Sequence, residues 1–313
     1  MDINMPGQVS KPSILITGAN GLLGQKLIDR LRGDTRFNIL ATGRGTSRLP
    51  RDWKGYTYVH MDITQPEQVS GIFLQYKPDI SIHCASMTNV DQCEIDREAC
   101  YEHNVTAVSY IAQACEKSGT HLIHLSTDFI FDGNGGPYLE DDRPNPINYY
   151  GQSKLASEKI VKTSSGDWTI VRTGLVYGIS VDMSRSNIVL WVKKALEEGK
   201  ELNLVDDQIR TPTLAEDLAE GCVLIAEKKA TGVFNISGKE LLTPYDMAVE
   251  TAAFFKLDKS KIKKANSRDF TQTAKRPLKT GFIIDKAVNF LNYRPHSFKE
   301  GIAIMAKQIN FKP

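Results

Sequence analysis

The chain of 313 residues alternates short apolar runs with longer helical patterns through its first two thirds and again near residue 235. The short runs are rich in β-branched and other apolar residues, which is typical of buried strands. They lie at residues 13–17, 37–42, 56–60, 79–84, 121–126, 168–173 and 232–237. Parallel strands need crossover connections, which are usually helices. The alternation therefore predicts an α/β fold with a doubly wound parallel sheet and helices on both faces.

Three evenly spaced glycines follow the first of these runs. Gly18, Gly21 and Gly24 lie in ITGANGLLG, just before an amphipathic stretch from Leu22 to Leu31. Glycine lets the backbone approach a pyrophosphate closely, and a helix N-terminus stabilises the negative charge. The spacing GxxGxxG differs from the GxGxxG fingerprint by one inserted residue. It predicts a Rossmann-like dinucleotide site, with an ordinary strand-to-helix turn as the alternative.

The pattern changes after about residue 176, where we expect helices at 184–199 and 243–256 and a final helical run near 285–290. We interpret these pieces as a smaller mixed substrate-binding lobe at the C-terminal side. A helix at 213–229 and the strand at 232–237 should return to the sheet. The predicted division is 1–176 and 210–240 for the dinucleotide-binding domain, with 177–209 and 241–313 for the lobe. The ligand cleft should lie between them, beyond the carboxyl ends of the strands.

The segment from Asp128 to Asn148 is crowded with glycine and proline and interrupts the alternation. Long structured loops in compact domains often carry function, so we expect this one to form a wall of the active site. A surface excursion is the alternative.

A tyrosine and a lysine lie four residues apart just beyond that loop, in YYGQSKLASEK. A phenol is a poor acid or base at neutral pH unless a nearby cation stabilises its ionised form. Residues at i and i+4 share a helix face, so Tyr150 and Lys154 can act in one site. The neighbouring Tyr149 has the uncharged Ser153 at that spacing. An amphipathic surface helix is the alternative explanation.

Two further polar residues fit a site for ketone reduction, in which negative charge builds on the carbonyl oxygen. Thr127 follows the strand 121–126 and can supply a hydroxyl, with Ser126 as the fallback and a strand cap as the alternative role. Asn104 lies inside a long helical run, where asparagine has poor propensity. It could equally be a tolerated polar residue on an exposed face.

The residues after the second strand indicate which dinucleotide is bound. An acid at this place usually accepts the ribose hydroxyls of NAD, whereas an arginine can accept a 2′-phosphate. The sequence here is Gly43-Arg44-Gly45-Thr46-Ser47-Arg48, with no acid. Arg44, helped by Arg48, therefore favours NADPH, with NADH left as an alternative cofactor. Two solvated loop arginines would be the non-functional explanation.

Composition excludes several classes of function. The net charge of +2 gives no indication of nucleic acid or a membrane surface as partner. No apolar run approaches the ~20 residues needed to span a bilayer, and the polar start lacks a signal-peptide core, so we expect a cytoplasmic protein. Five cysteines without a CxxC pair favour packed free thiols over a metal site or disulfides.

Longer motifs connect these features to a known family. They are HCASMTNVDQCE from His83, LSTDFIFDG from Leu125, DDQ from Asp206 with TPT from Thr211, and Arg276-Pro277. In this order, from about residue 13 to about residue 282, the chain resembles the dTDP-4-dehydrorhamnose reductase family of the extended short-chain dehydrogenase/reductases.

The resemblance implies roles for individual residues. Thr127, Tyr150 and Lys154 would be catalytic, with Tyr150 as the acid. Asp62 would hydrogen-bond adenine, although it could instead be a helix N-cap. Asn104 would bend its helix and support the lysine. The cofactor-binding residues implied are Gly18, Asn20, Gly21, Leu22, Leu23, Gly24, Arg44, Asp62, Ile63, Cys84, Ala85, Ser86, Asn104, Tyr150 and Lys154. The substrate-binding residues implied are Thr88, Val90, Asp91, Gln208, Arg210 and Arg276.

The chain also departs from the family pattern. Leu175 replaces a tryptophan that rhamnose enzymes tend to place against the substrate, and Thr280 and Phe282 replace a serine and a leucine after the Arg-Pro motif. The sugar pocket is therefore expected to differ.

Three functions fit the sequence. The first is NADPH-dependent reduction of the 4-keto group of a nucleotide-linked 6-deoxysugar. The second is a non-catalytic, NADP-binding regulatory subunit, because the beta subunit of methionine adenosyltransferase is similar to this family. An epimerase or dehydratase is the third, but Asp128 is followed by Phe129 rather than a second acid, and the Arg44 loop disfavours tightly held NAD. The sequence leaves the sugar, the use of a metal and a homodimer open.

Overall fold

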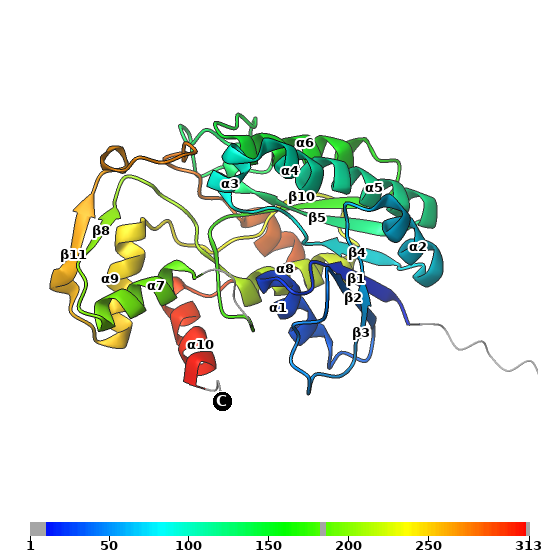
Figure 1. Cartoon of the computed structure of the whole chain (residues 1–313), viewed down its shortest axis with the longest axis horizontal. Helices are drawn as coiled ribbons and strands as arrows, with labels where there is room; N and C mark the ends of the chain where they lie inside the picture. The colour runs from blue at the N-terminus through cyan, green and yellow to red at the C-terminus, as the bar shows by residue number, and fades with distance from the viewer. Residues whose placement is uncertain (1–10, 182–185, 311–313) are drawn as a thin grey trace, which may run out of the picture.

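The computed structural model describes residues 11–181 and 186–310. A large sheet with helices on both faces forms one part of the molecule, and a smaller lobe projects from one end (Figure 1). Among the described residues, no helix is both long and apolar enough to cross a membrane.

The central sheet has seven strands, all parallel, in the order β10-β6-β5-β4-β1-β2-β3. Its strands are β1 (Ser13–Thr17), β2 (Asn38–Gly43), β3 (Thr57–His60), β4 (Ile80–His83), β5 (His121–Thr127), β6 (Trp168–Thr173) and β10 (Gly232–Asn235). The order reverses between β1 and β4, and ligands of such sheets bind at the carboxyl ends beside this point. The predicted doubly wound parallel sheet is confirmed.

Helices cover both faces of the sheet. The long ones are α1 (Leu22–Leu31), α2 (Pro66–Tyr76), α5 (Ala107–Ser118), α6 (Tyr149–Thr163) and α8 (Ala215–Lys228). One face carries α2, α5 and α6, and the other carries α1 and α8 (Figure 1). Successive residues of β1 point to opposite faces. Ile14 and Ile16 accordingly pack in one apolar core and Leu15 in the other.

Short elements lead into and out of the sheet. They are α3 (Val90–Ile95), α4 (Arg97–Tyr101), the π-helical turn η1 (Glu102–Thr106), the 3₁₀ turn η2 (Asp128–Ile130) and the parallel pair β7 (Val176–Tyr177) and β9 (Thr213–Leu214). The last residue of β5 is Thr127, one residue later than predicted.

The lobe contains a two-stranded parallel sheet and three helices. Its elements are α7 (Ile188–Glu197), β8 (Leu202–Val205), α9 (Pro244–Phe255), η3 (Lys259–Lys261), β11 (Ile262–Ala265), η4 (Ser267–Asp269) and α10 (Phe298–Asn310). The predicted helix from residue 184 begins at Ile188, and residue 184 itself lies outside the described residues. The final run near 285–290 includes a π-helical turn, η5 (Ala287–Leu291), and sequence reasoning missed α10 altogether.

A buried ion pair fixes α6 to the sheet. The guanidinium of Arg172, on β6, donates from Nε and Nη2 to the two carboxylate oxygens of Glu158, on α6, at 2.9 and 2.8 Å. Ser126, on β5, donates to the same carboxylate at 2.7 Å. Nη1 of Arg172 also donates to the carbonyl of Glu140, which ties down the loop after β5. This ion pair therefore fixes the position of α6, the helix that carries Tyr150, relative to β5 and β6.

We expect Arg172→Leu to lower the free energy of unfolding by about 3–5 kcal/mol, because the carboxylate of Glu158 would stay buried without its partner. Urea unfolding at neutral pH measures the change. Lys263→Ala is the control, since its pair with Glu201 is more than half exposed on both sides and should contribute less than about 1 kcal/mol. Equal losses in the two variants would contradict the structural role of the buried pair.

Candidate active site at the carboxyl edge of the sheet

The glycines after β1 pack the backbone tightly. Gly18 has φ +68°, and a Cβ there would lie 2.9 Å from the amide nitrogen of Ala85. A Cβ on Gly24 would lie 2.3 Å from the carbonyl oxygen of Gly18. The N-cap of α1 is Gly21, and neither a capping side chain nor an acid occupies its first turn. This helix N-terminus fits a negatively charged group such as a pyrophosphate.

Asn20 holds the loop after β2 in place. Its side-chain amide donates to the carbonyls of Arg44 and Thr46 and to the hydroxyl of Tyr58, and its oxygen accepts the N–H of Arg48 at 2.8 Å. Asn20, one of the predicted cofactor residues, therefore shapes the loop that carries both predicted phosphate-binding arginines.

Asp62 follows β3 on the same side of the sheet. Its Oδ1 accepts from the amide and the hydroxyl of Thr64, whereas the N-cap of α2 is Gln65, so the alternative N-cap role for Asp62 is wrong. Burial opposes ionisation of Asp62, but hydrogen bonds from Thr64 and the charges of Arg44 and His103 bring its pKa below the ordinary value. The neighbouring Ile63 is buried.

The segment after β4 is held by two side chains. The hydroxyl oxygen of Thr17 accepts the amides of Cys84 and Ala85, at 3.2 and 3.3 Å. Asn104 accepts from the hydroxyl of Ser86 and from the amide of Met87, and its amide donates back to the carbonyl of Met87. Asn104 lies in the π-helical turn η1, and such turns often occur at functional sites. It is fully buried, which rules out the alternative of an exposed helix face.

Tyr150 lies in the first turn of α6, whose N-cap Asn148 accepts the amide of Gly151 at 2.8 Å. Burial raises the pKa of Tyr150 above its ordinary value, and a hydrogen bond with Thr127 opposes this effect. The phenol is therefore protonated at neutral pH, and stabilisation of its ionised form by Lys154, which the i, i+4 spacing predicts, stays a prediction. Ser126 is committed to Glu158, which leaves Thr127 as the hydroxyl beside Tyr150.

Lys154 is buried one turn further along α6. Its Nζ lies 3.5 Å from Nε2 of His124, and that imidazole also lies 3.0 Å from the hydroxyl of Ser157. Burial lowers the pKa of Lys154 to about 8, against the opposing charge of Glu158. His124 stacks on His83 of the adjacent strand, with ring centroids 5.6 Å apart. Lys154 therefore lies beside a stacked pair of buried imidazoles, those of His124 and His83.

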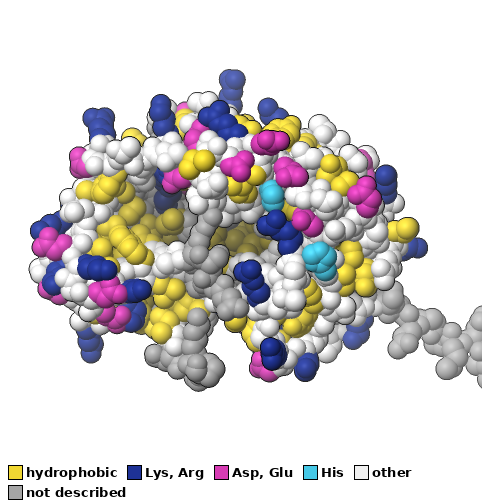
Figure 2. All heavy atoms as spheres, viewed as in Figure 1, with side chains coloured by type: hydrophobic (Ala, Val, Ile, Leu, Met, Phe, Trp, Pro, Cys, Tyr) yellow, Lys and Arg dark blue, Asp and Glu magenta, His cyan; other side chains and the backbone are white. Residues whose placement is uncertain are grey.

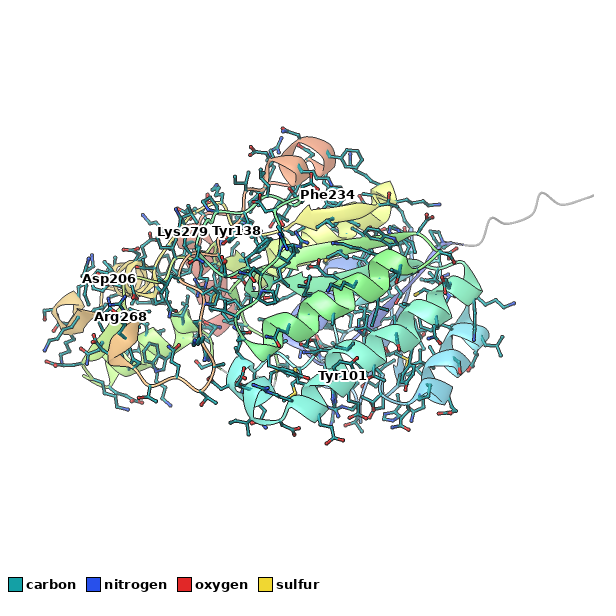
Figure 3. The ribbon with its side chains drawn as sticks, turned by 90° about the horizontal axis from the view of Figure 1, so that it is seen from above. Tyr101, Tyr138, Asp206, Phe234, Arg268 and Lys279 are labelled. Atoms are coloured by element: carbon teal, nitrogen blue, oxygen red, sulfur yellow. The ribbon has the colours of Figure 1, made fainter. Side chains whose placement is uncertain are left out.

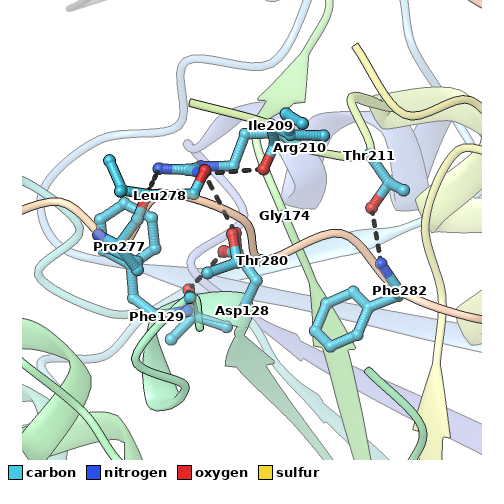
Figure 4. A network of polar contacts seen from close by, with 12 residues as sticks. Asp128, Phe129, Gly174, Ile209, Arg210, Thr211, Pro277, Leu278, Thr280 and Phe282 are labelled. Carbon is cyan, nitrogen blue, oxygen red and sulfur yellow. Dashed lines mark hydrogen bonds and ion pairs between the residues drawn. The ribbon is translucent and has the colours of Figure 1, made fainter. Parts of the chain in front are cut away.

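Asp128, just after β5, connects this strand to the segments that carry Arg210 and Thr280 (Figure 4). Its carboxylate accepts from the hydroxyls of Thr127 and Thr280 and lies 3.8 Å from Nε of Arg210. Burial raises its pKa, although Arg210 and Thr280 act in the opposite direction. A Cβ on Gly174 would lie 3.0 Å from this carboxyl group, so the turn after β6 needs glycine there.

The predicted substrate residues lie on both sides of the junction between sheet and lobe, and two of them bind each other. Asp91 receives a bidentate ion pair from Arg276, at 2.5 and 2.6 Å, and also the amide of Ala274. Arg210 is buried and donates to the carbonyls of Ile209, Pro277 and Leu278. Gln208 is buried, Val90 is half-buried and Thr88 is exposed.

Two views show how these segments lie. In Figure 3, Tyr138 and Lys279 lie where the sheet meets the lobe, whereas Asp206 and Arg268 lie out on the lobe. Figure 2 shows that this face of the molecule is hollowed between the two parts, with hydrophobic side chains on the walls. Leu175, near this junction, has φ +39° and is 40% exposed, an uncommon backbone conformation for leucine.

Sequence reasoning did not find several residues that build the site. Chief among them are Tyr58 and His103 beside the Arg44 loop, and His83 and His124 beneath Lys154. His83 begins one of the quoted motifs, but the motif gave it no role. Sequence alone does not show these contacts, because they join strands and helices that are distant in the chain. In the described part of the chain the cysteines form no disulfide, and the same residues contain no cluster of three potential metal ligands.

Comparison with known proteins gives a consistent result. Residues 12–311 match the family model described as RmlD substrate binding domain. A probable low-salt glycan biosynthesis reductase, Agl14, from Haloferax volcanii is 32% identical over 294 residues, which cover 93% of this chain and 96% of the relative. The methionine adenosyltransferase 2 subunit beta of Xenopus tropicalis is 30% identical over 267 residues, covering 84% and 76%. The solved dTDP-4-dehydrorhamnose reductase of Bacillus anthracis in complex with NADP is 27% identical, with a TM-score of 0.82 and coverage of 96% and 100%.

We expect Asp128→Asn to destabilise the protein by about 3 kcal/mol, because the buried guanidinium of Arg210 would lose the carboxylate that faces it. Chemical denaturation measures the difference. Asp141→Asn, at an exposed position in the following loop, is the control and should change stability by less than about 0.5 kcal/mol. An Asp128→Asn protein as stable as wild type would mean that this carboxylate does not hold the two segments together.

Proposed function

Because the chain belongs to the RmlD substrate binding domain family, which confirms the resemblance drawn from its motifs, we propose that it is an NADPH-dependent reductase of a nucleotide-linked 4-keto-6-deoxysugar. The observation that carries this proposal is the grouping of a half-buried phenol, a threonine hydroxyl and a buried lysine on α6 and at the end of β5. The glycine-rich N-terminus of α1 lies at the same edge of the sheet.

NADPH fits the residues present. The uncapped first turn of α1 suits the pyrophosphate, Asp62 and Ile63 would contact adenine, and Arg44 would hold the 2′-phosphate. Cys84, Ala85, Ser86 and Asn104 would line the path from the pyrophosphate to the nicotinamide. The solved relative bound to NADP supports this cofactor, and NADH is the alternative.

The chain's own residues would act on the ketone oxygen. When bound, NADPH supplies the hydride that reduces the carbonyl carbon. Thr127 donates a hydrogen bond to the oxygen as negative charge builds there, and Tyr150 delivers the proton. The phenol of Tyr150 is protonated at neutral pH and so carries the proton to be delivered, although burial by itself makes it a weaker acid. The ammonium of Lys154 then stabilises the phenolate and holds the nicotinamide ribose, and solvent returns the proton.

The substrate would lie between sheet and lobe. Thr88, Val90 and Asp91 are proposed to contact the sugar, and Gln208, Arg210 and Arg276 the nucleotide and its diphosphate. Arg276 is paired with Asp91, so the diphosphate would take over donors that now bind a carboxylate. Arg210 already donates to three backbone carbonyls. We therefore assign it a structural role in the wall of the site as well as contact with the ligand. A cytoplasmic location and a homodimer remain predictions.

A second function is supported by the methionine adenosyltransferase 2 subunit beta, which is similar to this chain over 84% of its length. The protein would then bind NADP and regulate a partner without turnover. The stretch from Thr88 to Glu94 favours the reductase, because it matches those enzymes in sequence.

The test is oxidation of NADPH in the presence of dTDP-4-keto-L-rhamnose, followed by absorbance. We expect turnover by wild type and a loss of about 10²–10⁴-fold in Tyr150→Phe, because only the proton donor is removed. Affinity for NADPH should stay close to wild type. Tyr149→Phe is the matched control, since that ring lies beneath Arg97 and should leave turnover intact.

Activity that persists in Tyr150→Phe would move the chemistry to another residue. No turnover by wild type, together with a partner recovered by pull-down that binds only when NADP is present, would favour the regulatory function.

We expect Arg44→Ala to narrow the preference for NADPH over NADH by about tenfold to a hundredfold, because it removes a charged hydrogen bond to the 2′-phosphate. The ratio of dissociation constants for the two cofactors measures this. Arg51→Ala removes an exposed positive charge a short way along the chain and is the control. An unchanged ratio in Arg44→Ala would remove Arg44 from the site.

A further inference from the structure

His103 faces the arginine that is proposed to hold the 2′-phosphate. Nε2 of its imidazole lies 3.4 Å from Nη1 of Arg44, although the two residues are 59 positions apart. Nδ1 lies 2.9 Å from the carbonyl oxygen of Ala99. A carbonyl can only accept, so Nδ1 carries the hydrogen of the neutral ring. The lone pair of Nε2 therefore points at the guanidinium and accepts from it.

The charges around this imidazole are mixed. Arg44 and Asp62 face it from the loops after β2 and β3, and the charge of Arg44 helps to lower the pKa of Asp62. Glu102, on the same helix as His103, has a carboxylate oxygen 3.9 Å from Nδ1. Its side chain is 53% exposed, so water weakens its interaction with the imidazole. The His103 side chain is 23% exposed, so a ligand can reach it. Figure 2 shows histidine side chains beside basic and acidic ones on this face.

A second histidine near this loop supports the loop backbone and does not face Arg44. His60, the last residue of β3, accepts the amide of Gly45 on Nδ1 at 3.0 Å. It is thus fixed as a support for the loop backbone, which leaves His103 as the imidazole that faces Arg44.

We propose that His103 is a second ligand of the 2′-phosphate of NADPH, and that it gains a proton when the phosphate binds. The inference rests on the proposed NADPH site. An imidazolium 3.4 Å from a guanidinium is unfavourable without an anion, because two positive charges face each other. A phosphate dianion between the two groups would make protonation of the imidazole favourable, and Nε2 would then donate a charged hydrogen bond to the phosphate.

Protonation and phosphate binding are then linked, since each favours the other. The preference for NADPH over NADH should rise as the pH falls through the neutral range, because the protonated ring binds the phosphate and contributes nothing to a ribose hydroxyl.

Calorimetric titration of the full chain with NADP⁺ tests this directly. The heat at about neutral pH is measured in two buffers of different ionisation enthalpy, which gives the number of protons taken up. His103→Gln keeps a polar side chain of similar size that cannot be charged. We expect wild type to take up more protons than His103→Gln and to bind NADP⁺ about tenfold more tightly below neutral pH.

Two controls isolate the imidazole. The 2′-phosphate itself can change protonation, but this contribution is the same for both proteins, so the difference between them reports His103. Titration with NAD⁺, which lacks the 2′-phosphate, should show a smaller difference between wild type and variant. His103→Lys carries a permanent charge, so it should bind NADP⁺ tightly without the extra proton uptake.

The outcomes separate this inference from the proposed function. Tight NADP⁺ binding with equal proton uptake in wild type and His103→Gln, or with equal affinities across pH, would overturn the role of His103 while leaving the NADPH site in place. Wild type that binds no NADP⁺ would overturn both.

Discussion

The candidate site depends first on the buried ion pair between Glu158 and Arg172. It joins α6 to β6, and the hydroxyl of Ser126 adds β5 to the same carboxylate. Burying two charges is costly, and the cost is offset here because the geometry is bidentate and the remaining donor of the guanidinium finds the carbonyl of Glu140. Tyr150 and Lys154 lie on the helix fixed in this way, so their distance from Thr127 at the end of β5 follows from the pair. A looser contact would leave the phenol free to shift along the sheet by more than a hydrogen bond tolerates.

Two polar side chains, Asn20 and Asn104, shape the backbone at the carboxyl edge of the sheet. The side-chain amide and oxygen of Asn20 form hydrogen bonds with the loop that carries Arg44. The side chain of Asn104 bonds to both the N–H and the carbonyl of Met87. Each of these side chains is satisfied within the protein, which makes the edge of the sheet rigid before any ligand arrives. The π-helical turn η1 is what brings Asn104 and His103 to this edge, since both lie within its five residues.

The substrate side is built by contacts between segments rather than by one element. Asp128 connects the end of β5 to Arg210 and Thr280, while Asp91 connects α3 to Arg276. The carboxylates of Asp91 and Asp128 therefore connect α3 and β5 to segments on the other side of the junction between sheet and lobe. Leu175, Thr280 and Phe282, where the chain departs from the family pattern, lie close to this network or within it.

The sequence by itself determined the layered α/β fold, the glycine turn and the position of Tyr150 and Lys154 one turn apart on the same helix, because period, turn chemistry and helical spacing act over a few residues. Strand ends were correct to within one or two residues for most of the sheet, since burial on both faces fixes where an apolar run starts and stops. Only the tertiary structure decided that His103 meets Arg44, that Asp128 meets Arg210, and that burial raises the pKa of Tyr150. These outcomes depend on which loops the folded chain brings together and on how much water it excludes from them, and a local sequence pattern encodes neither. The same reason explains the missed helix α10, which packs on the lobe through contacts with segments far away in the chain.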